Sequence, residues 1–386
     1  MTNFFSSDFK LGILGGGQLG KMLLYETRKY DIQTYVLDPS EEAPARLACD
    51  YFEQGDLMDF DKVLQFGRNV DVLTFEIESV SVSALEQLER EGIQVYPSSG
   101  TLKRIQSKAI QKEFYKNNGI PTSDFKIFNS KKDLESAVDD GSRSLPFVWK
   151  SATGGYDGKG VSVIRNLQDL QELPDVTCVA EELVPFKNEL AVIVARNPSG
   201  EVRTYPVVEM EFHPEANQVE YVICPARIAP EVAELARAVA KEVSQAFAHV
   251  GLLAVELFQT EDDRILVNEV APRPHNSGHY SIEASFTNQF EQHLRAILDL
   301  PLGDTSSKVG GIMVNLVGAE GHSGQVIYEN IEEIMALKGV TPHIYGKKFT
   351  RPFRKMGHVT IVNQDLDKAR KIAGKVKDTI RVISKT

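Results

Sequence analysis

Cysteine is scarce in this sequence. Its three cysteines, Cys49, Cys178 and Cys224, are scattered among 386 residues and form no Cys-x-x-Cys pair. This spacing does not suit a cysteine-based metal site. We therefore expect three reduced, buried thiols, which are typical of a cytosolic protein.

Long apolar runs are also missing. No stretch approaches the roughly 20 residues of a membrane span, and the N-terminus lacks the charged-then-apolar pattern of a signal peptide. The formal net charge of −11 argues against nucleic acid as a partner of the whole chain. A local basic patch would still suit a small anion. We expect a cytoplasmic protein that binds neither membrane nor nucleic acid.

The remaining composition is that of a globular protein, with 42% hydrophobic and 25% charged residues. A chain of 386 residues is too long for one hydrophobic core. The length predicts two or three domains.

A glycine-rich turn follows the first predicted strand, Leu11–Leu14. Gly15, Gly17 and Gly20 have the GxGxxG spacing, which presents backbone N–H groups and a helix N-terminus to an anion. The next strand, Gln33–Leu37, ends beside Asp38, where a ribose-binding acid would lie. The turn therefore suggests a dinucleotide site. The alternative is a close strand–helix turn without a ligand.

Two more strands, Val72–Phe75 and Ile93–Tyr96, complete an alternation with helical stretches over about the first 100 residues. This pattern predicts a doubly wound α/β domain. Its ligands would lie at the carboxyl ends of the strands, where the glycine turn, Asp38 and Glu76 are found.

A second glycine-rich segment, residues 151–160, lies between the strands Phe147–Lys150 and Val161–Ile164. Its N–H groups can surround phosphates as a flap, and Lys150 and Lys159 would add positive charge. It is not a Walker loop, because no GKS/T follows and the next element is a strand. The alternative is an ordinary glycine-rich hairpin.

A pair of glutamates is predicted on one hairpin. If Thr260 pairs with Ile265 across the turn at 261–264, Glu256 lies directly opposite Glu269 on the same face. Opposed like charges destabilise a hairpin unless a cation lies between them, and Mg²⁺ is usually bound by one or two carboxylates and by phosphate oxygens. Asn268 would face the other way in a regular strand. The alternative is a solvated hairpin face.

The loop after this hairpin is rich in polar side chains. Residues 268–279 carry Glu269, Arg273, His275, Asn276 and His279, while two prolines and a glycine exclude a helix interior. Later, residues 345–355 hold five basic residues in an acidic protein. They form either a solvated turn or a phosphate site.

The coarse pattern predicts further elements. We expect a charged helix at Ser107–Asn118, strands at Thr177–Glu182, Glu189–Ala195, Arg203–Glu209 and Lys308–Val317, and helices at Pro230–Val250 and Phe290–Leu298.

Four motifs together resemble the ATP-grasp ligases and, within them, the ATP-dependent 5-(carboxyamino)imidazole ribonucleotide synthetases of purine biosynthesis. They are GGGQLGKM at 15–22, GGYDGKG at 154–160, EELV at 181–184 and NEVAPRPHNSGH at 268–279. The resemblance covers nearly the whole chain. It implies an α/β fold, α+β in part: the ATP-grasp fold with an N-terminal doubly wound (pre-ATP-grasp) domain, a flap domain and a C-terminal domain. We place these domains at residues 1–105, 106–186 and 187–386.

The resemblance also implies the reaction. ATP, bicarbonate and 5-aminoimidazole ribonucleotide would give the carbamate, ADP and phosphate in a homodimeric enzyme. The implied Mg²⁺ ligands are Glu256 and Glu269. The implied ATP-binding residues are Lys108, Lys150, Gly155, Tyr156, Asp157, Gly158, Lys159, Gly160, Glu181, Glu182, Leu183, Val184, Glu189, His213, Asn268 and Glu269.

Other motif positions match the second substrate and the chemistry. The implied ribonucleotide-binding residues are Gln18, Leu19, Glu76, Tyr156, Asp157, Lys159, Lys348, Arg351, Arg354 and Lys355. The implied catalytic residues are Arg273, His275, Asn276, Glu76 and Asp157. The family often has arginine where Lys108 and Lys159 stand.

The principal alternative within the fold is the formate-dependent glycinamide ribonucleotide transformylase. An acidic residue normally follows the turn glycines of that enzyme, and Gln18 stands at this position here, which favours the carboxylating enzyme. A nucleotide-sensing module without catalysis is a third alternative. The glutamate pair and the flap lysines argue against it.

Overall fold

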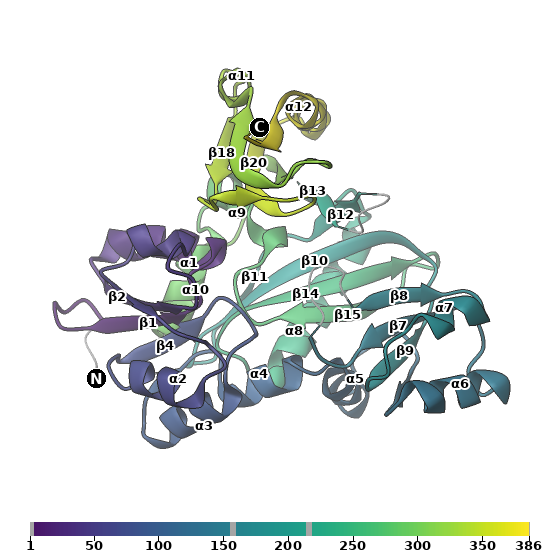
Figure 1. Ribbon diagram of the computed structural model, residues 1–386. Coiled ribbons are helices and arrows are strands. Elements are labelled where there is room, and N and C mark those ends of the chain that lie inside the picture. The colour runs from purple at the N-terminus through teal and green to yellow at the C-terminus, as the bar shows by residue number, and fades with distance from the viewer. Residues whose placement is uncertain (1–3, 155–159, 214–217, 386) are drawn as a thin grey trace.

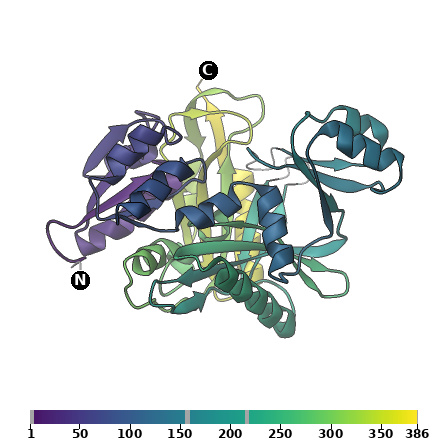
Figure 2. The same cartoon turned by 90° about the horizontal axis from the view of Figure 1, so that it is seen from below.

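The computed structural model describes residues 4–154, 160–213 and 218–385. The N-terminal sheet lies on the left of Figure 1, a small sheet lies on the right, and the long strands of a large sheet run between them; Figure 2 shows the same arrangement from below. No helix within the described residues is long and apolar enough to cross a membrane.

The N-terminal sheet is parallel, in the order β3-β2-β1-β4-β5. Its strands are β1 (Lys10–Leu14), β2 (Gln33–Asp38), β3 (Tyr51–Gln54), β4 (Val72–Phe75) and β5 (Gln94–Val95). Its helices are α1 (Gln18–Thr27), α2 (Phe60–Gly67), α3 (Val82–Arg90) and α4 (Ser99–Ile105). The core clusters place α1 on one face of this sheet and α2 and α3 on the other. The predicted doubly wound topology is confirmed, and the strand order reverses at β1.

The small sheet has the order β6-β9-β7-β8 and is antiparallel. Its strands are β6 (Phe125–Phe128), β7 (Phe147–Ser151), β8 (Val161–Ile164) and β9 (Cys178–Glu182). Residues of α6 (Lys131–Asp139) and α7 (Leu167–Gln171) pack with Phe147 and Trp149 on one face. Lys150 and Glu181 point to the opposite face, toward α5 (Lys108–Asn117).

The large sheet has the order β15-β14-β10-β12-β13-β16-β20-β18, with β11 beside β10. Its strands are β10 (Phe186–Arg196), β11 (Val202–Thr204), β12 (Val208–Phe212), β13 (Val219–Cys224), β14 (Gly251–Thr260), β15 (Ile265–Ala271), β16 (Gly310–Val317), β18 (Val340–Ile344) and β20 (Lys355–Asn363). Helix α8 (Pro230–Phe247) packs on its first strands. Helices α9 (Ser281–Ala284) and α10 (Gln289–Ile297) follow the hairpin β14–β15, and α10 reaches back to the core of the N-terminal sheet.

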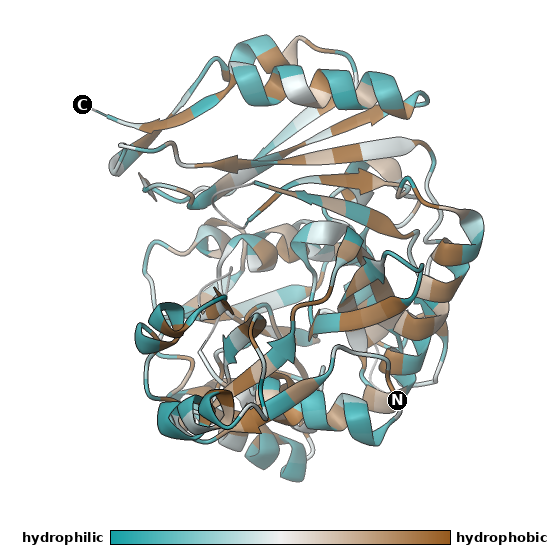
Figure 3. Ribbon diagram, turned by 90° about the vertical axis from the view of Figure 1, so that its right-hand side faces the viewer, coloured by the Kyte–Doolittle hydropathy of each residue, from teal (hydrophilic) through white to brown (hydrophobic). Residues whose placement is uncertain are grey.

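The remaining elements lie at the C-terminal end. They are β17 (Gly324–Glu329), β19 (Phe349–Thr350), β21 (Arg381–Ser384), α11 (Ile331–Met335) and α12 (Leu366–Thr379). Ala369, Ala373 and Val376 are the buried residues of α12, and the rest of the helix is largely hydrophilic, as the top of Figure 3 shows.

One predicted strand is wrong. The segment Arg203–Glu209 forms two strands, β11 and β12, because Pro206 has no N–H group for the ladder and interrupts the pairing with β10. The predicted helix Pro230–Val250 ends earlier, at Phe247, where Ala248 adopts a left-handed conformation with φ of 47°.

Candidate active site

The two glutamates of the hairpin do lie opposite each other. Glu256 of β14 pairs with Glu269 of β15, as predicted. The predicted register at the turn is wrong, because Gln259 rather than Thr260 pairs with Ile265. A β-bulge lies between the Gln259–Ile265 pair and the glutamate pair. It places one extra residue, Asn268, in β15, so that Glu256 and Glu269 still face each other.

This bulge also changes the direction of Asn268. Its Oδ1 accepts a hydrogen bond of 2.8 Å from Lys150 Nζ, on the small sheet. In a regular strand Asn268 would face away from Glu269, but a bulge turns the side chain beside it to a new direction. The Asn268 amide is thus turned toward the lysine side of the glutamate pair.

A third carboxylate lies on the next strand. Ala191 of β10 pairs with Glu256, so Glu189, two residues earlier, is on the same face. Burial, followed by the charges of Glu269 and Glu189, raises the pKa of Glu256 above its ordinary range. Lys108 forms an ion pair with Glu269 and holds the pKa of Glu269 below its ordinary range. Burial also raises the pKa of Glu189 to about 7.

These carboxylates fit a hard divalent cation. Buried carboxylates that face each other are stable only with a proton or a cation between them, and oxygen donors suit Mg²⁺. Across the described ranges, no group of three or more His, Cys, Asp or Glu side chains has metal-site geometry. Mg²⁺ is usually held by one or two protein carboxylates and keeps its other coordination positions for phosphate and water oxygens.

Two lysines share the buried carboxylate of Glu181. Lys112 Nζ lies 2.8 Å from Glu181 Oε2, and Lys150 Nζ lies 3.1 Å from Glu181 Oε1. Ser123 Oγ donates to the same carboxylate at 2.8 Å. Although burial alone would raise it, these positive charges lower the pKa of Glu181 to about 2. Because its carboxylate is engaged, Glu181 can offer a nucleotide little beyond its backbone.

The other residues of the predicted adenine segment lie at the surface. Glu182 and Leu183 are exposed. Glu182 and Val184 line a cavity of about 220 Å³ together with Asp124, Arg264 and the hairpin turn. This cavity lies beside the connection from β9 of the small sheet to β10 of the large sheet.

The loop that follows β15 meets the glutamate pair on one side and the N-terminal domain on the other. His275 Nε2 lies 3.4 Å from Glu256 Oε1. Arg273 Nε lies 2.9 Å from Glu78 Oε1, just beyond β4. Asn276 exchanges two hydrogen bonds of 2.9 Å with Asn315 of β16. The structure thus brings Arg273, His275 and Asn276 together at a junction of domains.

Carboxylates already occupy the N–H groups of the first glycine turn. Gly17 N and Gly20 N donate to Glu76 at 3.0 and 3.3 Å, and Gly16 N donates to Asp38 at 2.7 Å. A dinucleotide phosphate would need these donors, so the arrangement disfavours the dinucleotide interpretation. Burial raises the pKa of Glu76 to about 7, against the opposing effects of the glycine N–H groups and Arg273.

The remaining predicted residues near this turn differ in their environment. Gln18 is half-buried at the start of α1, whereas the Leu19 side chain is buried in the hydrophobic core, so only its backbone can meet a ligand. Lys21 Nζ, one turn further, donates to the carbonyl oxygens of Ile344 and Tyr345 at 3.1 and 3.3 Å. This contact joins the glycine turn to the start of the basic segment 345–355.

Within the basic segment, Lys348 pairs with Glu42 of the N-terminal domain at 2.8 Å, and Arg354 Nη1 donates to the carbonyl of Phe349 at 2.5 Å. Arg351 is exposed, and Lys355 begins β20, where its charge acts on Glu256. The ring of His213 lies 6.0 Å from that of Phe353. The basic segment and the predicted nucleotide contact His213 therefore lie on the same side of the site.

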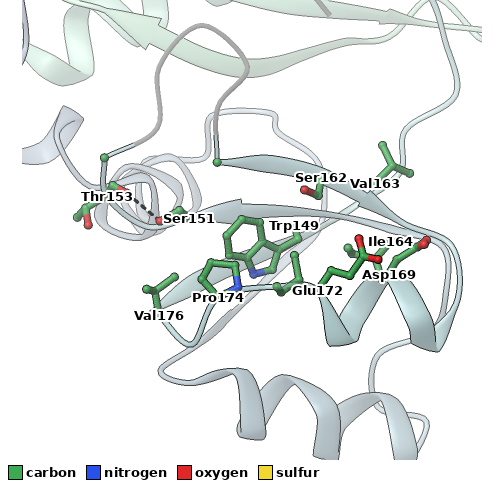
Figure 4. Close-up of a pocket in the computed structure, with 13 residues that line it drawn as sticks. Trp149, Ser151, Thr153, Ser162, Val163, Ile164, Asp169, Glu172, Pro174 and Val176 are labelled. Atoms are coloured by element: carbon green, nitrogen blue, oxygen red, sulfur yellow. Dashed lines mark hydrogen bonds between the residues drawn. The ribbon is translucent and has the colours of Figure 1, made fainter. Parts of the chain in front are cut away.

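Five predicted flap residues, Gly155, Tyr156, Asp157, Gly158 and Lys159, lie outside the described residues. Gly160 is described, and its carbonyl accepts a hydrogen bond of 2.9 Å from Ser151 N. A cavity of about 540 Å³ adjoins the flap ends and is lined by Trp149, Ser151 and Asp169 (Figure 4). It opens on the face of β7 opposite Lys150, so it is separate from the glutamate pair.

Sequence reasoning missed two side chains that hold this site. Lys112 lies on the predicted helix Ser107–Asn118 but belongs to none of the recognised motifs, although its spacing of four residues from Lys108 puts both on one helical face. Gln289, which bonds to the backbone of His275, lies outside every recognised motif, and no local signal marks it.

Family models match three successive segments. Residues 9–106 match the ribonucleotide synthetase preATP-grasp domain, residues 113–290 the ATP-grasp domain, and residues 311–372 the phosphoribosylaminoimidazole carboxylase C-terminal domain. The N5-carboxyaminoimidazole ribonucleotide synthase of Synechococcus elongatus is 38% identical over 357 residues, which are 91% of this chain and 89% of that protein. The chain belongs to the N5-carboxyaminoimidazole ribonucleotide synthase family.

Solved structures of this family agree with the fold. A crystal structure of the synthetase from Thermotoga maritima has a TM-score of 0.90 and 43% identity, covering 98% of this chain and 100% of that one. The synthase from Aspergillus clavatus, in complex with ADP and 5-aminoimidazole ribonucleotide, has a TM-score of 0.88 and 33% identity, covering 97% and 98%. The predicted ATP-grasp fold and family are thus confirmed.

Proposed function

We propose that this protein carboxylates 5-aminoimidazole ribonucleotide, using bicarbonate and ATP, in purine biosynthesis. The observation that carries the proposal is the meeting of two chemically distinct halves: a half-buried glutamate pair with lysines, and a buried carboxylate on a glycine turn. The Arg273–His279 loop joins them through His275 and Arg273. The ligands named for the Aspergillus clavatus relative suit these two halves.

The first half would hold ATP. Glu256 and Glu269 would bind Mg²⁺, with Asn268 beside them, and Mg²⁺ would neutralise charge on the transferred phosphoryl group. Lys108 and Lys150 would contact the phosphates, and the flap 155–160 would close over them. The adenine would lie at residues 181–184, the ribose at Glu189, and His213 would make a further contact.

The second half would perform the carboxylation. A bicarbonate oxygen would attack the γ-phosphorus of ATP; the bond from that phosphorus to the β–γ bridging oxygen would break, so that ADP leaves and carboxyphosphate forms. The exocyclic amine then attacks the carboxyl carbon, directly or as released CO₂; the carbon–oxygen bond to phosphate breaks, and the amine loses a proton. Arg273, His275 and Asn276 would hold the bicarbonate. Exclusion of water by the flap is required because carboxyphosphate hydrolyses readily.

The ribonucleotide would lie between the N-terminal domain and the basic segment. Its base would meet Gln18, the backbone of Leu19 and Glu76, together with flap residues Tyr156, Asp157 and Lys159. Its 5′-phosphate would be bound by members of the set Lys348, Arg351, Arg354 and Lys355. The hydrogen bonds from Lys21 to the carbonyls of Ile344 and Tyr345 support this arrangement, because they join α1 to the start of the basic segment.

Glu76 is suited to accept the amine proton, with Asp157 as the other carboxylate available for this role. With a pKa near 7, Glu76 is ionised above that pH and protonated below it, so kcat should fall as pH drops through about 7. In Glu76→Gln we expect kcat to be about 100-fold lower and this acid limb to disappear.

A matched control for Glu76→Gln is Glu89→Gln. The Glu89 carboxylate also accepts a backbone N–H, from Ser99 at 2.7 Å, in the same domain but away from the glycine turn. Steady-state kcat should be measured from pH 5.5 to 9 for both variants, and Glu89→Gln should keep the wild-type kcat and its fall at low pH. An unchanged kcat and acid limb in Glu76→Gln would exclude Glu76 as the base.

The assembly and compartment follow the family resemblance. We propose a homodimer in the cytoplasm, with Cys49, Cys178 and Cys224 as free thiols. Light scattering of the purified protein at micromolar concentration tests the dimer, and a monomer mass would contradict it.

The function itself is tested by ADP release with Mg²⁺, ATP and bicarbonate, with and without 5-aminoimidazole ribonucleotide. We expect strong stimulation by the ribonucleotide, and little by the riboside that lacks the 5′-phosphate, since the basic segment would have no anion to bind. Stimulation instead by formate with glycinamide ribonucleotide would overturn the substrate assignment while leaving the fold intact.

A further inference from the structure

The N-terminus of α10 lies against the Arg273–His279 loop. Gln289, the first residue of this helix, is fully buried. Its Oε1 accepts a hydrogen bond of 2.9 Å from the His275 backbone N–H, and its Nε2 donates to the His275 carbonyl at 2.8 Å. One side-chain amide thus satisfies both backbone groups of His275, as a neighbouring strand would do.

These two bonds fix the orientation of the amide and define a third contact. Because Oε1 faces an N–H donor, the atom 2.8 Å from His279 Nδ1 is the Nε2 donor. His279 therefore accepts at Nδ1 and carries its hydrogen on Nε2. Both ends of the loop, His275 and His279, are held by the same side chain.

The loop is shaped to admit this side chain. A Cβ on Gly278 would lie 2.4 Å from Gln289 Oε1, so a larger residue there would displace the amide. Ser281 Oγ donates to the Gly278 carbonyl at 2.5 Å and accepts from Gln289 N at 3.0 Å. The glycine of the HNSGH motif thus leaves room for a side chain ten or more residues away.

The contacts of Gln289 with His275 also affect the glutamate pair, because the His275 imidazole lies next to Glu256. Ser277 N donates to His275 Nδ1 at 3.3 Å, which leaves the hydrogen on Nε2, 3.4 Å from Glu256 Oε1. Holding the His275 backbone therefore aims its imidazole N–H at Glu256. Helix α10 is itself tied to α1, since Asn288 Nδ2 donates to Glu26 at 2.8 Å, so the loop and the glycine turn share one support.

We propose that Gln289 is a positioning residue, which holds the Arg273–His279 loop in the geometry needed for bicarbonate activation and carboxyl transfer. This inference rests on the proposed function. Gln289 acts through the backbone of His275 and through His279, without touching a substrate.

The chain supplies a matched control one turn along α10. Gln292 is also fully buried and makes the same reciprocal pair with Gly303: Oε1 accepts from Gly303 N at 2.8 Å, and Nε2 donates to the Gly303 carbonyl at 3.1 Å. Gly303 lies in the loop after α10, outside the Arg273–His279 loop. Gln289→Glu and Gln292→Glu each lose the donor and gain a buried charge.

Steady-state kinetics with Mg²⁺-ATP, bicarbonate and 5-aminoimidazole ribonucleotide compares the two variants. In Gln289→Glu we expect kcat to fall by about 100-fold, as for a displacement of about 1 Å at a reacting centre. KM for ATP should stay unchanged, because Lys108 and Lys150 lie on other elements. Gln292→Glu should keep the wild-type kcat and KM.

Amide hydrogen exchange of Gln289→Leu and Gln292→Leu, which lack the side-chain acceptor, gives a readout independent of substrate. The His275 amide should exchange faster in Gln289→Leu, because its N–H loses Gln289 Oε1, and at the wild-type rate in Gln292→Leu. Equal loss of kcat in both glutamate variants, or wild-type kcat in Gln289→Glu together with wild-type His275 exchange in Gln289→Leu, would overturn the inference. Wild-type protein that is indifferent to the ribonucleotide would instead overturn the proposed function, and the exchange rates would still decide the role of Gln289.

Discussion

Replacing Glu269 with Gln should lower kcat by about 1,000-fold, because the substitution removes a charged ligand of the proposed Mg²⁺ and the counter-charge of Lys108. The size of the effect follows from geometry: Glu269 lies directly opposite Glu256, and the divalent cation would lie between them. The loss should appear as ADP release that no longer responds to the ribonucleotide. The Mg²⁺ concentration for half-maximal rate should rise as well.

A suitable control is Glu209→Gln on β12. Glu209 is a buried carboxylate of the same sheet and forms an ion pair of 2.5 Å with Arg227. It lies on the opposite face from the glutamate pair, because it is paired with Leu190, whose side chain points away from that of the adjacent Glu189. Loss of the ion pair with Arg227 in Glu209→Gln should lower the free energy of unfolding and leave kcat nearly unchanged. Wild-type kcat and Mg²⁺ dependence in Glu269→Gln would remove this residue from the metal site.

Glu181→Gln should lower the free energy of unfolding by about 3–5 kcal/mol, because it leaves the buried ammonium groups of Lys112 and Lys150 without their shared carboxylate. The next residue offers a sharp comparison. Glu182 is exposed, so Glu182→Gln should change stability by no more than about 0.5 kcal/mol. Urea unfolding at neutral pH measures both.

The stabilisation from Glu181 should also depend on pH in a defined direction. Its pKa in the folded protein, about 2, is below the ordinary value of 4.5. The contribution is therefore fully present above pH 4.5 and is lost as pH falls from 4.5 toward 2. The difference between wild type and Glu181→Gln should shrink over that interval. A difference that stays constant would mean that the carboxylate charge is not what stabilises the pair of lysines.

Much of the site could be predicted because its parts are local. The strand–turn–helix at Gly15–Gly20 and the hairpin carrying Glu256 and Glu269 depend on residues close together in the chain. Alternation and turn residues are enough to place such elements. The motif resemblance then supplied the fold, which no single pattern could specify.

The errors came from departures from regular geometry. The bulge at Asn268 is why Glu256 and Glu269 pair although the register at the turn differs from the predicted one, and it also changes the direction of the Asn268 side chain. The amino-acid sequence of a strand does not show which residue will be left unpaired. Pro206, by contrast, was a visible signal that the segment Arg203–Glu209 could not be one strand.

By itself, the sequence determined which side chains are available at the proposed phosphate and Mg²⁺ sites, and the strands and turns that carry them, because those depend on neighbours along the chain. Only the tertiary structure decided the pKa values of these side chains and the directions in which they point. Glu76 occupies the N–H groups of a turn 56 residues or more away, Lys112 and Lys150 share Glu181, and Gln289 holds the loop of His275. Burial and distant partners set these features, and both arise only when separate segments pack together.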